Sequence, residues 1–255
     1  MSQISVPESV TIVPQAQRFE TSISWLDSHH CFSFGQHWDE KNTHFGLLLV
    51  SNDDIVKPGA GFETHGHKDM EIVTWVLSGA LVHQDSEGHT GVIYPGLAQR
   101  MSAGKGILHS EKNDSWNITG EAAHNEPVHF IQMWVPPHER GIDPGYEQLD
   151  INDELSQGGL VVVASGMEKY QDRRAIKINQ KYATLFSARM KPNEVVQLPH
   201  APFVHVFCAV GSAAIEGQPL MQQGDAARIS GGAGQRVVAG PEGAEILVWE
   251  MHASF

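Results

Sequence analysis

Hydrophobic segments along the chain are short, rich in β-branched and aromatic residues, and separated by glycine, proline and polar turns. Residues 70–77 (MEIVTWVL) form one such segment, and residues 128–135 (VHFIQMWV) form another that ends at Pro136-Pro137. Proline stops a strand because it lacks a backbone donor, and glycine adopts the conformations that turns require. Helical periodicity is scarce along the chain. The pattern therefore predicts an all-β protein.

The second half of the chain repeats this rhythm. It predicts strands at residues 160–164, 182–190, 203–210, 213–216 and 244–251. Between the two halves, residues 136–154 are polar and rich in turn residues and lack strand periodicity. Such a stretch is typical of a connection between domains. We therefore expect two domains, residues 1–138 and 139–255.

A weak internal repeat favours this division. Gly79 and Gly211 each follow an apolar run, at an offset of 132 residues, and residues 101–106 (MSAGKG) resemble residues 229–234 (ISGGAG) at an offset of 128. The order of the segments is kept and their spacing nearly so, as in a duplicated domain. Chance agreement between glycine-rich β segments is the alternative explanation.

Charge and cysteine content exclude several functional classes. The chain has 17 basic and 30 acidic residues, a formal net charge of −13, which argues against nucleic-acid binding. Its two cysteines, Cys31 and Cys208, cannot build a disulfide framework or a CxxC motif. For Cys31 we expect burial, with an oxidisable thiol as the alternative. No apolar run approaches the roughly 18 residues of a membrane span. We expect a cytoplasmic protein that binds neither nucleic acid nor membrane.

Histidine is concentrated in residues 1–138, which hold twelve of the fifteen histidines. His65-Gly66-His67 and His109-Ser110-Glu111 each follow a glycine-rich turn, and residues i and i+2 of a strand point to the same face. Two such strands side by side would direct three imidazoles and one carboxylate to one point. This donor set suits Fe(II), Mn, Ni, Cu or Zn. The alternative is a set of surface histidines, because composition alone produces each pair about once.

Longer motifs around these residues resemble known families. Gly59, His65, His67 and Gly79 are spaced as in the first cupin motif, and Gly106, His109 and Asn113 as in the second. More narrowly, the chain resembles the pirin family over residues 25–147, and more faintly to its end, through residues 25–28 (WLDS), 32–35 (FSFG), 65–71 (HGHKDME), 84–88 (QDSEG) and 101–111 (MSAGKGILHSE). The resemblance implies a bicupin, two jelly-roll β-barrels in one chain, with one metal ion in the N-terminal barrel. Fe(II) is the expected ion.

One departure from the cupin pattern concerns the carboxylate ligand. A typical cupin has a glutamate where this chain has Ile72, and Glu71 is one residue out of phase, so its side chain faces the opposite side of the strand. The resemblance to pirins instead makes Glu111 the ligand. We expect Glu71 to serve as an ion-pair or capping partner.

The second half lacks these ligands. The repeat offsets place Gln197, Pro199, Val237 and Ala239 opposite the four predicted ligands. The C-terminal domain should therefore be structural. For His200 and His205 we expect ordinary core or surface positions.

The resemblance also implies a reaction, the opening of a flavonol ring such as that of quercetin by O₂. Glu111 would act as general base toward the substrate hydroxyl. For the substrate pocket we expect Phe32, Phe34, His37, Phe45 and Trp134. Two alternatives are a redox or metal-sensing regulator that acts through an unidentified protein partner, and a bicupin for another small phenolic or carbonyl substrate. In each case we expect a monomer.

Overall fold

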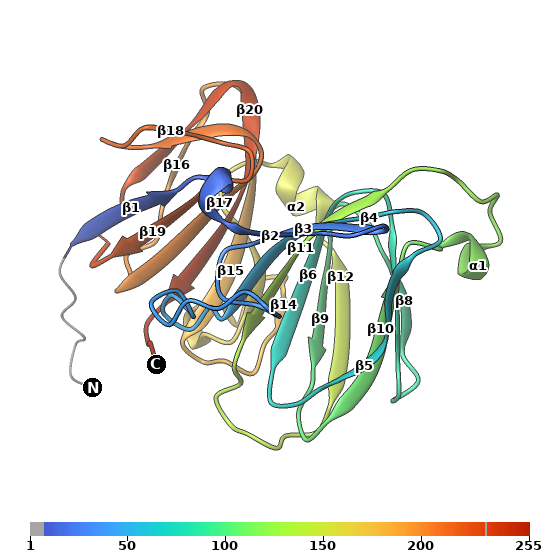
Figure 1. Ribbon diagram of the computed structural model, residues 1–255. Coiled ribbons are helices and arrows are strands. Elements are labelled where there is room, and N and C mark those ends of the chain that lie inside the picture. The colour runs from blue at the N-terminus through green and yellow to red at the C-terminus, as the bar shows by residue number, and fades with distance from the viewer. Residues whose placement is uncertain (1–7, 233) are drawn as a thin grey trace.

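The computed structural model describes residues 8–232 and 234–255, which form two β lobes in contact with each other (Figure 1). The N-terminal lobe has two facing sheets. The larger has the strand order β12 (Gly145–Asp150), β9 (Leu97–Ser102), β6 (Glu71–Ser78), β11 (Val128–Val135), β4 (Val50–Val56), β3 (Leu26–His30) and β2 (Phe19–Ser22). The smaller has the order β5 (Gly61–His67), β10 (Ile107–Lys112), β7 (Leu81–Asp85) and β8 (Thr90–Ile93).

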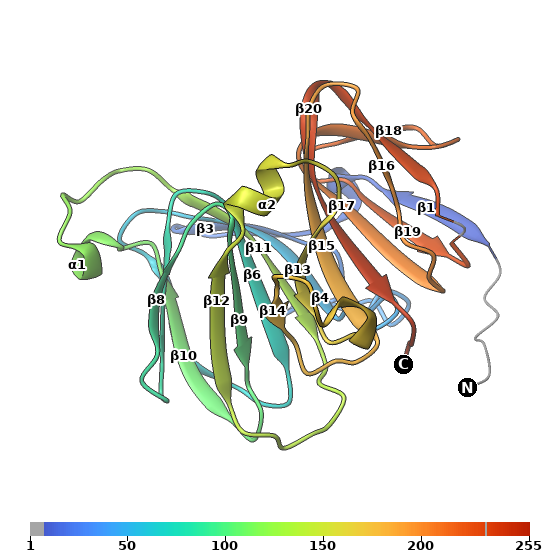
Figure 2. The ribbon, with the colours of Figure 1, turned by 180° about the vertical axis from the view of Figure 1, so that it is seen from behind.

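The C-terminal lobe is built on long, bent strands that Figure 2 shows from behind. Its strand order is β1 (Ser9–Val13), β19 (Ala226–Ser230), β17 (Phe203–Ile215), β20 (Arg236–Met251), β15 (Ala183–Met190), β13 (Val161–Ser165) and β14 (Ile176–Lys177), with β16 (Val195–Gln197) beside β20 and β18 (Leu220–Gln222) beside β17. Helical segments are short: η1 (Gln15–Gln17), α1 (Trp116–Thr119), α2 (Asn152–Ser156) and η2 (Glu168–Tyr170). Within the described ranges, none of them has the length and apolar character needed to span a membrane.

The all-β prediction is confirmed, and the facing sheets form jelly-roll sandwiches rather than closed barrels. The strand predicted at residues 128–135 coincides with β11. The two strands predicted at 203–210 and 213–216 are one, β17, which passes through two register shifts on either side of Gly211. Bulges of this kind bend a strand without ending it.

Residues 136–154, which were expected to connect the two domains, contain β12, and this strand pairs along its whole length with β9. β12 is an edge strand with half-buried side chains and no apolar alternation, so the sequence gives no strand signal. The division at residues 138 and 139 stays a prediction. Strand pairing crosses it twice, since β12 belongs to the N-terminal lobe and β1 pairs with β19 in the C-terminal lobe.

The two glycines that define the internal repeat share a conformation. Gly79 has φ +76° and Gly211 has φ +71°, a left-handed region that glycine tolerates best. A Cβ at Gly79 would lie 2.8 Å from the Pro127 carbonyl oxygen, and one at Gly211 would lie 2.3 Å from that of Gly243. Both positions therefore require glycine for the same reason, a close approach of another backbone segment, at the end of β6 for Gly79 and at the bulged part of β17 for Gly211.

One hydrophobic core spans the two lobes. It includes Trp75 and Met133 from the large N-terminal sheet and Trp249 from β20. The indole nitrogen of Trp249 lies 3.3 Å from Met133 Sδ, and Trp75 Nε1 donates to Glu245 Oε1 at 2.7 Å. The outer face of the large sheet is thus covered by the C-terminal lobe, which explains why β6 and β11 are buried on both faces. The inner face of the large sheet remains available for a functional site.

Candidate metal centre

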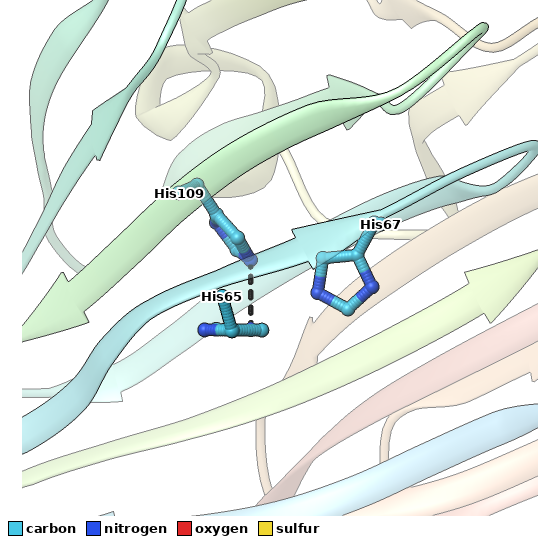
Figure 3. A group of neighbouring side chains, drawn as sticks. All are labelled: His65, His67 and His109. Atoms are coloured by element: carbon cyan, nitrogen blue, oxygen red, sulfur yellow. Dashed lines mark hydrogen bonds between the residues drawn. The ribbon is translucent and has the colours of Figure 1, made fainter.

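Strands β5 and β10 bring the predicted histidines together. The two strands are antiparallel, and His65 lies directly opposite His109 in the register. His65 and His67 project from the same face of β5, and Figure 3 shows all three imidazoles turned toward one another. The Nε2 atoms of His65 and His109 are 3.1 Å apart, and one ligand atom from each of the three rings lies within 4.8 Å of the others.

A glycine sets the position of Glu111 relative to this cluster. The register of β5 and β10 shifts between His109 and Glu111, and Gly61 packs directly on the backbone there. A Cβ on Gly61 would lie 2.2 Å from the Glu111 carbonyl oxygen. Any larger residue at position 61 would push Glu111 out of place, so glycine is a geometric requirement of the site.

The imidazole cluster has the chemistry of a metal site. Burial lowers the pKa of His67 to about 4, and burial with the neighbouring His65 lowers the pKa of His109 to about 3, so both rings are neutral at pH 7 and offer lone pairs. Among the described residues, His67 Nε2 is buried and has no hydrogen-bond partner. A buried polar atom without a partner is costly unless a ligand satisfies it. The donor set therefore fits a divalent first-row metal ion.

Glu111 is a buried carboxylate beside this cluster. Its Oε2 accepts a hydrogen bond from Gln132 Nε2 at 2.7 Å, and Thr74 Oγ1 lies 3.4 Å from its Oε1. It forms a second potential ligand group with His83 and His109, so His109 belongs to both groups. The four predicted ligands thus fall into two groups that share His109. One ion held by all four stays a prediction.

His83 and Asp85 on β7 extend the site behind His109. His83 is fully buried, its Nδ1 lies 3.4 Å from His109 Nδ1, and its Nε2 lies 3.2 Å from Asp85 Oδ2. One ring nitrogen of each neutral histidine carries hydrogen, so the chain Asp85–His83–His109 can hold His109 with Nε2 as the free lone pair. Sequence reasoning missed this pair. The signal was present, because His83 and Asp85 have the same i, i+2 spacing as the predicted ligands.

A cavity of about 760 Å³ opens onto His65, His67 and Glu111. Of the predicted pocket residues, Phe34 and Trp134 line it. The Trp134 ring lies edge-on to His67, with ring centroids 4.8 Å apart, and Phe34 packs edge-on against Trp134. Trp25 and Phe62, which sequence reasoning missed, form another part of the wall. The cavity is thus walled by aromatic rings next to the candidate ligands.

The other three predicted pocket residues do not line this cavity. Phe32 is in the core between the lobes, where the Arg228 guanidinium carbon is 4.7 Å from its ring centroid. Phe45 packs against Phe203 of the C-terminal lobe. His37 stacks on Phe19, with ring centroids 5.3 Å apart. Alternation along a strand does not tell which sheet an aromatic side chain will meet, and this is why the sequence could not separate these positions from the pocket.

Comparison with known proteins places the chain in a family. Residues 12–135 match the family model described as Pirin. Over 245 residues, 96% of each chain, it is 53% identical to the Mycobacterium tuberculosis protein named "Putative quercetin 2,3-dioxygenase". The chain belongs to the Pirin family. A solved structure of the Escherichia coli pirin YhhW in complex with nickel(II) superposes on this pirin with a TM-score of 0.84, at 30% identity and over 97% of this chain and 100% of that one.

A second curated relative matches the half that holds the site. This pirin is 46% identical to the Escherichia coli protein named "Quercetin 2,3-dioxygenase" over 132 residues, which are 52% of this chain and 54% of that one. The two relatives share a name that denotes a reaction, and the nickel complex shows a bacterial pirin with a bound transition metal.

Glu71 lies away from the imidazoles of this pirin. Its carboxylate is fully buried and accepts hydrogen bonds from Ser102 Oγ at 2.9 Å and from the Asn179 backbone nitrogen at 2.8 Å. Burial raises its pKa above the ordinary value. Glu71 therefore anchors the 178–180 segment of the C-terminal half on the large sheet. This agrees with the expectation that its side chain faces the side of β6 opposite to the site.

Both potential ligand groups found among residues 8–232 and 234–255 lie in the N-terminal lobe of this pirin. Gln197, Val237 and Ala239, which the repeat places opposite ligands, lie on β16 and β20. His205 is a core residue whose burial lowers its pKa to about 3, and its Nε2 has no partner within the described part of the chain. Both cysteines are free and buried.

Proposed function

We propose that this pirin is a metal-dependent dioxygenase that opens the central ring of a flavonol such as quercetin with O₂. The observation that carries the proposal is the position of Glu111, a buried carboxylate beside three imidazoles at the wall of an aromatic-lined cavity. A cavity of about 760 Å³ falls within the usual range for small-molecule sites. The names of the relatives support the same reaction.

His65, His67, His109 and Glu111 would hold the ion. Fe(II) is the expected metal, and Mn, Ni, Cu or Zn also suit imidazole and carboxylate donors. A bound divalent ion would supply Lewis acidity to a substrate hydroxyl oxygen and lower its pKa. The C-terminal lobe, which contributes none of these residues, would act as a support for the outer face of the large sheet.

Side chains of the protein would accept the substrate proton and orient the substrate. Glu111 Oε2 is held by Gln132, whereas within the described part of the chain Oε1 has only the long contact with Thr74. Oε1 is therefore the atom that would accept the proton of the substrate hydroxyl. Trp134 and Phe34 would orient a flat aromatic substrate and keep water from the deprotonated ring. We also propose that the protein acts as a monomer in the cytoplasm, where two buried free thiols remain reduced.

The test is an aerobic assay of the purified protein loaded separately with Fe(II), Mn(II), Ni(II), Cu(II) or Zn(II). We expect loss of the near-visible absorbance of quercetin and release of carbon monoxide with at least one metal. Full metal loading without turnover of any flavonol would overturn the proposed reaction. That outcome is the one expected of a metal-sensing regulator.

A further inference from the structure

The cavity has a polar wall that the proposed chemistry does not use. Ser28 and His30 of β3 and Asn52 and Asp54 of β4 all line it. In the sheet register Ser28 lies opposite Asp54, and His30 lies opposite Asn52. Side chains opposite each other on neighbouring strands share a face. The four residues therefore form one continuous patch on the inner face of the large sheet.

The hydrogen bonds within this patch leave one donor and one acceptor free. Asn52 Oδ1 lies 2.9 Å from His30 Nδ1, and Asp54 Oδ1 accepts from Ser28 Oγ. Within the described ranges, no protein group is hydrogen-bonded to Asn52 Nδ2 or Asp54 Oδ2, and neither atom is among the side-chain atoms sealed from solvent without a partner. Both atoms must therefore reach the cavity, where a ligand can meet them.

Such an arrangement is unfavourable in the absence of a ligand. Both residues are almost completely buried, at 4% and 3% exposure, and burial raises the pKa of Asp54 to about 7. Polar groups in such surroundings lose hydration that the protein does not replace. Aliphatic residues on β4 would pack as well, since its other inward-facing residues, Val50 and Val56, are aliphatic. The presence of Asn52 and Asp54 at these positions therefore indicates that they recognise a polar group of a ligand.

We propose that Asn52 and Asp54 form a subsite for a phenolic hydroxyl group on the part of the substrate remote from Glu111. The inference rests on the proposed function and narrows its substrate class to aromatics with hydroxyl groups on two separate rings. An amide N–H donates to a hydroxyl oxygen while a carboxyl oxygen accepts its hydrogen, so the pair complements one hydroxyl or two adjacent ones.

The spacing of the strands agrees with this geometry. Glu111 is held by Gln132 of β11 and lies near Thr74 of β6, and Asn52 lies opposite Gln132 in the register on the other side of β11. Neighbouring strands are about 4.8 Å apart, so the Asn52–Asp54 subsite lies one to two strand spacings from the groups that hold Glu111. A linked pair of aromatic rings can bridge that distance.

The test compares two flavonols that differ only on the pendant ring: quercetin, which carries two hydroxyl groups there, and galangin, which carries none. Binding is measured without oxygen on nickel-loaded protein, through quenching of tryptophan fluorescence, since Trp25 and Trp134 line the cavity. We expect the unmodified protein to bind quercetin about tenfold more tightly, the difference that one well-placed hydrogen bond gives. Asn52→Leu and Asp54→Leu should each remove that preference and leave galangin binding within about twofold.

Asp54→Asn provides a near-isosteric second variant, which keeps an acceptor for Ser28 and places a donor where Oδ2 stood. It should also lose the preference. Ile55→Ala is the matched control, because Ile55 directly follows Asp54 on β4 and is exposed on the outer face. Equal binding of both flavonols by the unmodified protein, or equal weakening of both by the variants, would overturn the subsite. Discrimination in binding without any aerobic turnover would overturn the dioxygenase reaction alone.

Discussion

His83 Nδ1 lies 3.4 Å from His109 Nδ1, while His109 Nε2 lies 3.1 Å from His65 Nε2. His109 is thus fixed from both sides, by the imidazole cluster in front and by His83 behind. His83 in turn is held by Asp85 and stacks on Tyr146, with ring centroids 4.8 Å apart. His83, which does not line the cavity, thus orients the candidate metal ligand His109.

Replacement of His83 should therefore weaken metal binding. In His83→Phe the ring can still stack on Tyr146, but the hydrogen-bonded link from His109 to Asp85 is lost. We expect affinity for Ni(II) or Fe(II) to fall about 10- to 100-fold, as is typical of groups that orient a metal ligand. Competition with a chromophoric chelator measures it. His89→Gln, on the more exposed side of Asp85, is the control, and unchanged affinity in His83→Phe would show that the link has no such role.

Glu111→Gln should abolish turnover of quercetin while the protein stays folded. The amide keeps the size of the side chain and can still meet Gln132, but it cannot take a proton at the Oε1 position. Loss of a general base typically costs about 10²- to 10⁴-fold in kcat. Steady-state kinetics and metal analysis of the same sample separate this effect from loss of the ion. Glu121→Gln, at an exposed position, should have normal kcat.

Metal removal should lower the thermal stability of the folded protein. An ion that binds only the native state stabilises it by about 2.7 kcal/mol at a free concentration of 100 times Kd. For a chain of this size that corresponds to a rise in Tm of about 5–10 °C, seen by calorimetry with and without a chelator. His67→Ala should remove most of the shift. A shift that survives in this variant would mean that the stabilising ion binds elsewhere.

Acid should destabilise the C-terminal lobe through His205. Burial lowers the pKa of His205 to about 3, below its unfolded value of 6.5, so in this window the unfolded chain binds more protons and stability falls as pH falls. One such group costs about 2 kcal/mol at pH 5 relative to pH 8. His205→Leu should reduce the loss by about that amount in urea unfolding at the two pH values. An identical pH dependence in the variant would contradict the assignment.

The sequence predicted the elements that have strong local signals. β11 was found with its bounds because six of its eight residues are apolar and it ends at Pro136-Pro137. The histidine pairs were found because glycine turns and i, i+2 spacing make them share a face. Both signals come from residues that are close together in the sequence, and the strands next to the turns keep the relative orientation of these residues.

Other features depend on contacts that the sequence does not display. β12 has no apolar alternation and is ordered by its pairing with β9. Phe32 and Phe45 looked like pocket residues, but the packing of the two lobes places them against Arg228 and Phe203. Nothing in the sequence marks Asp54 as a pocket residue, because its place at the cavity follows from the sheet register.

The central claim is that His65, His67, His109 and Glu111 hold one ion in the N-terminal lobe. Anomalous diffraction from crystals grown with Ni(II) tests it most directly. We predict one strong peak per chain within about 2.0–2.2 Å of one nitrogen of each histidine and one oxygen of Glu111. A peak in the C-terminal lobe, or an ion at the histidines with Glu111 turned away from it, would contradict the account.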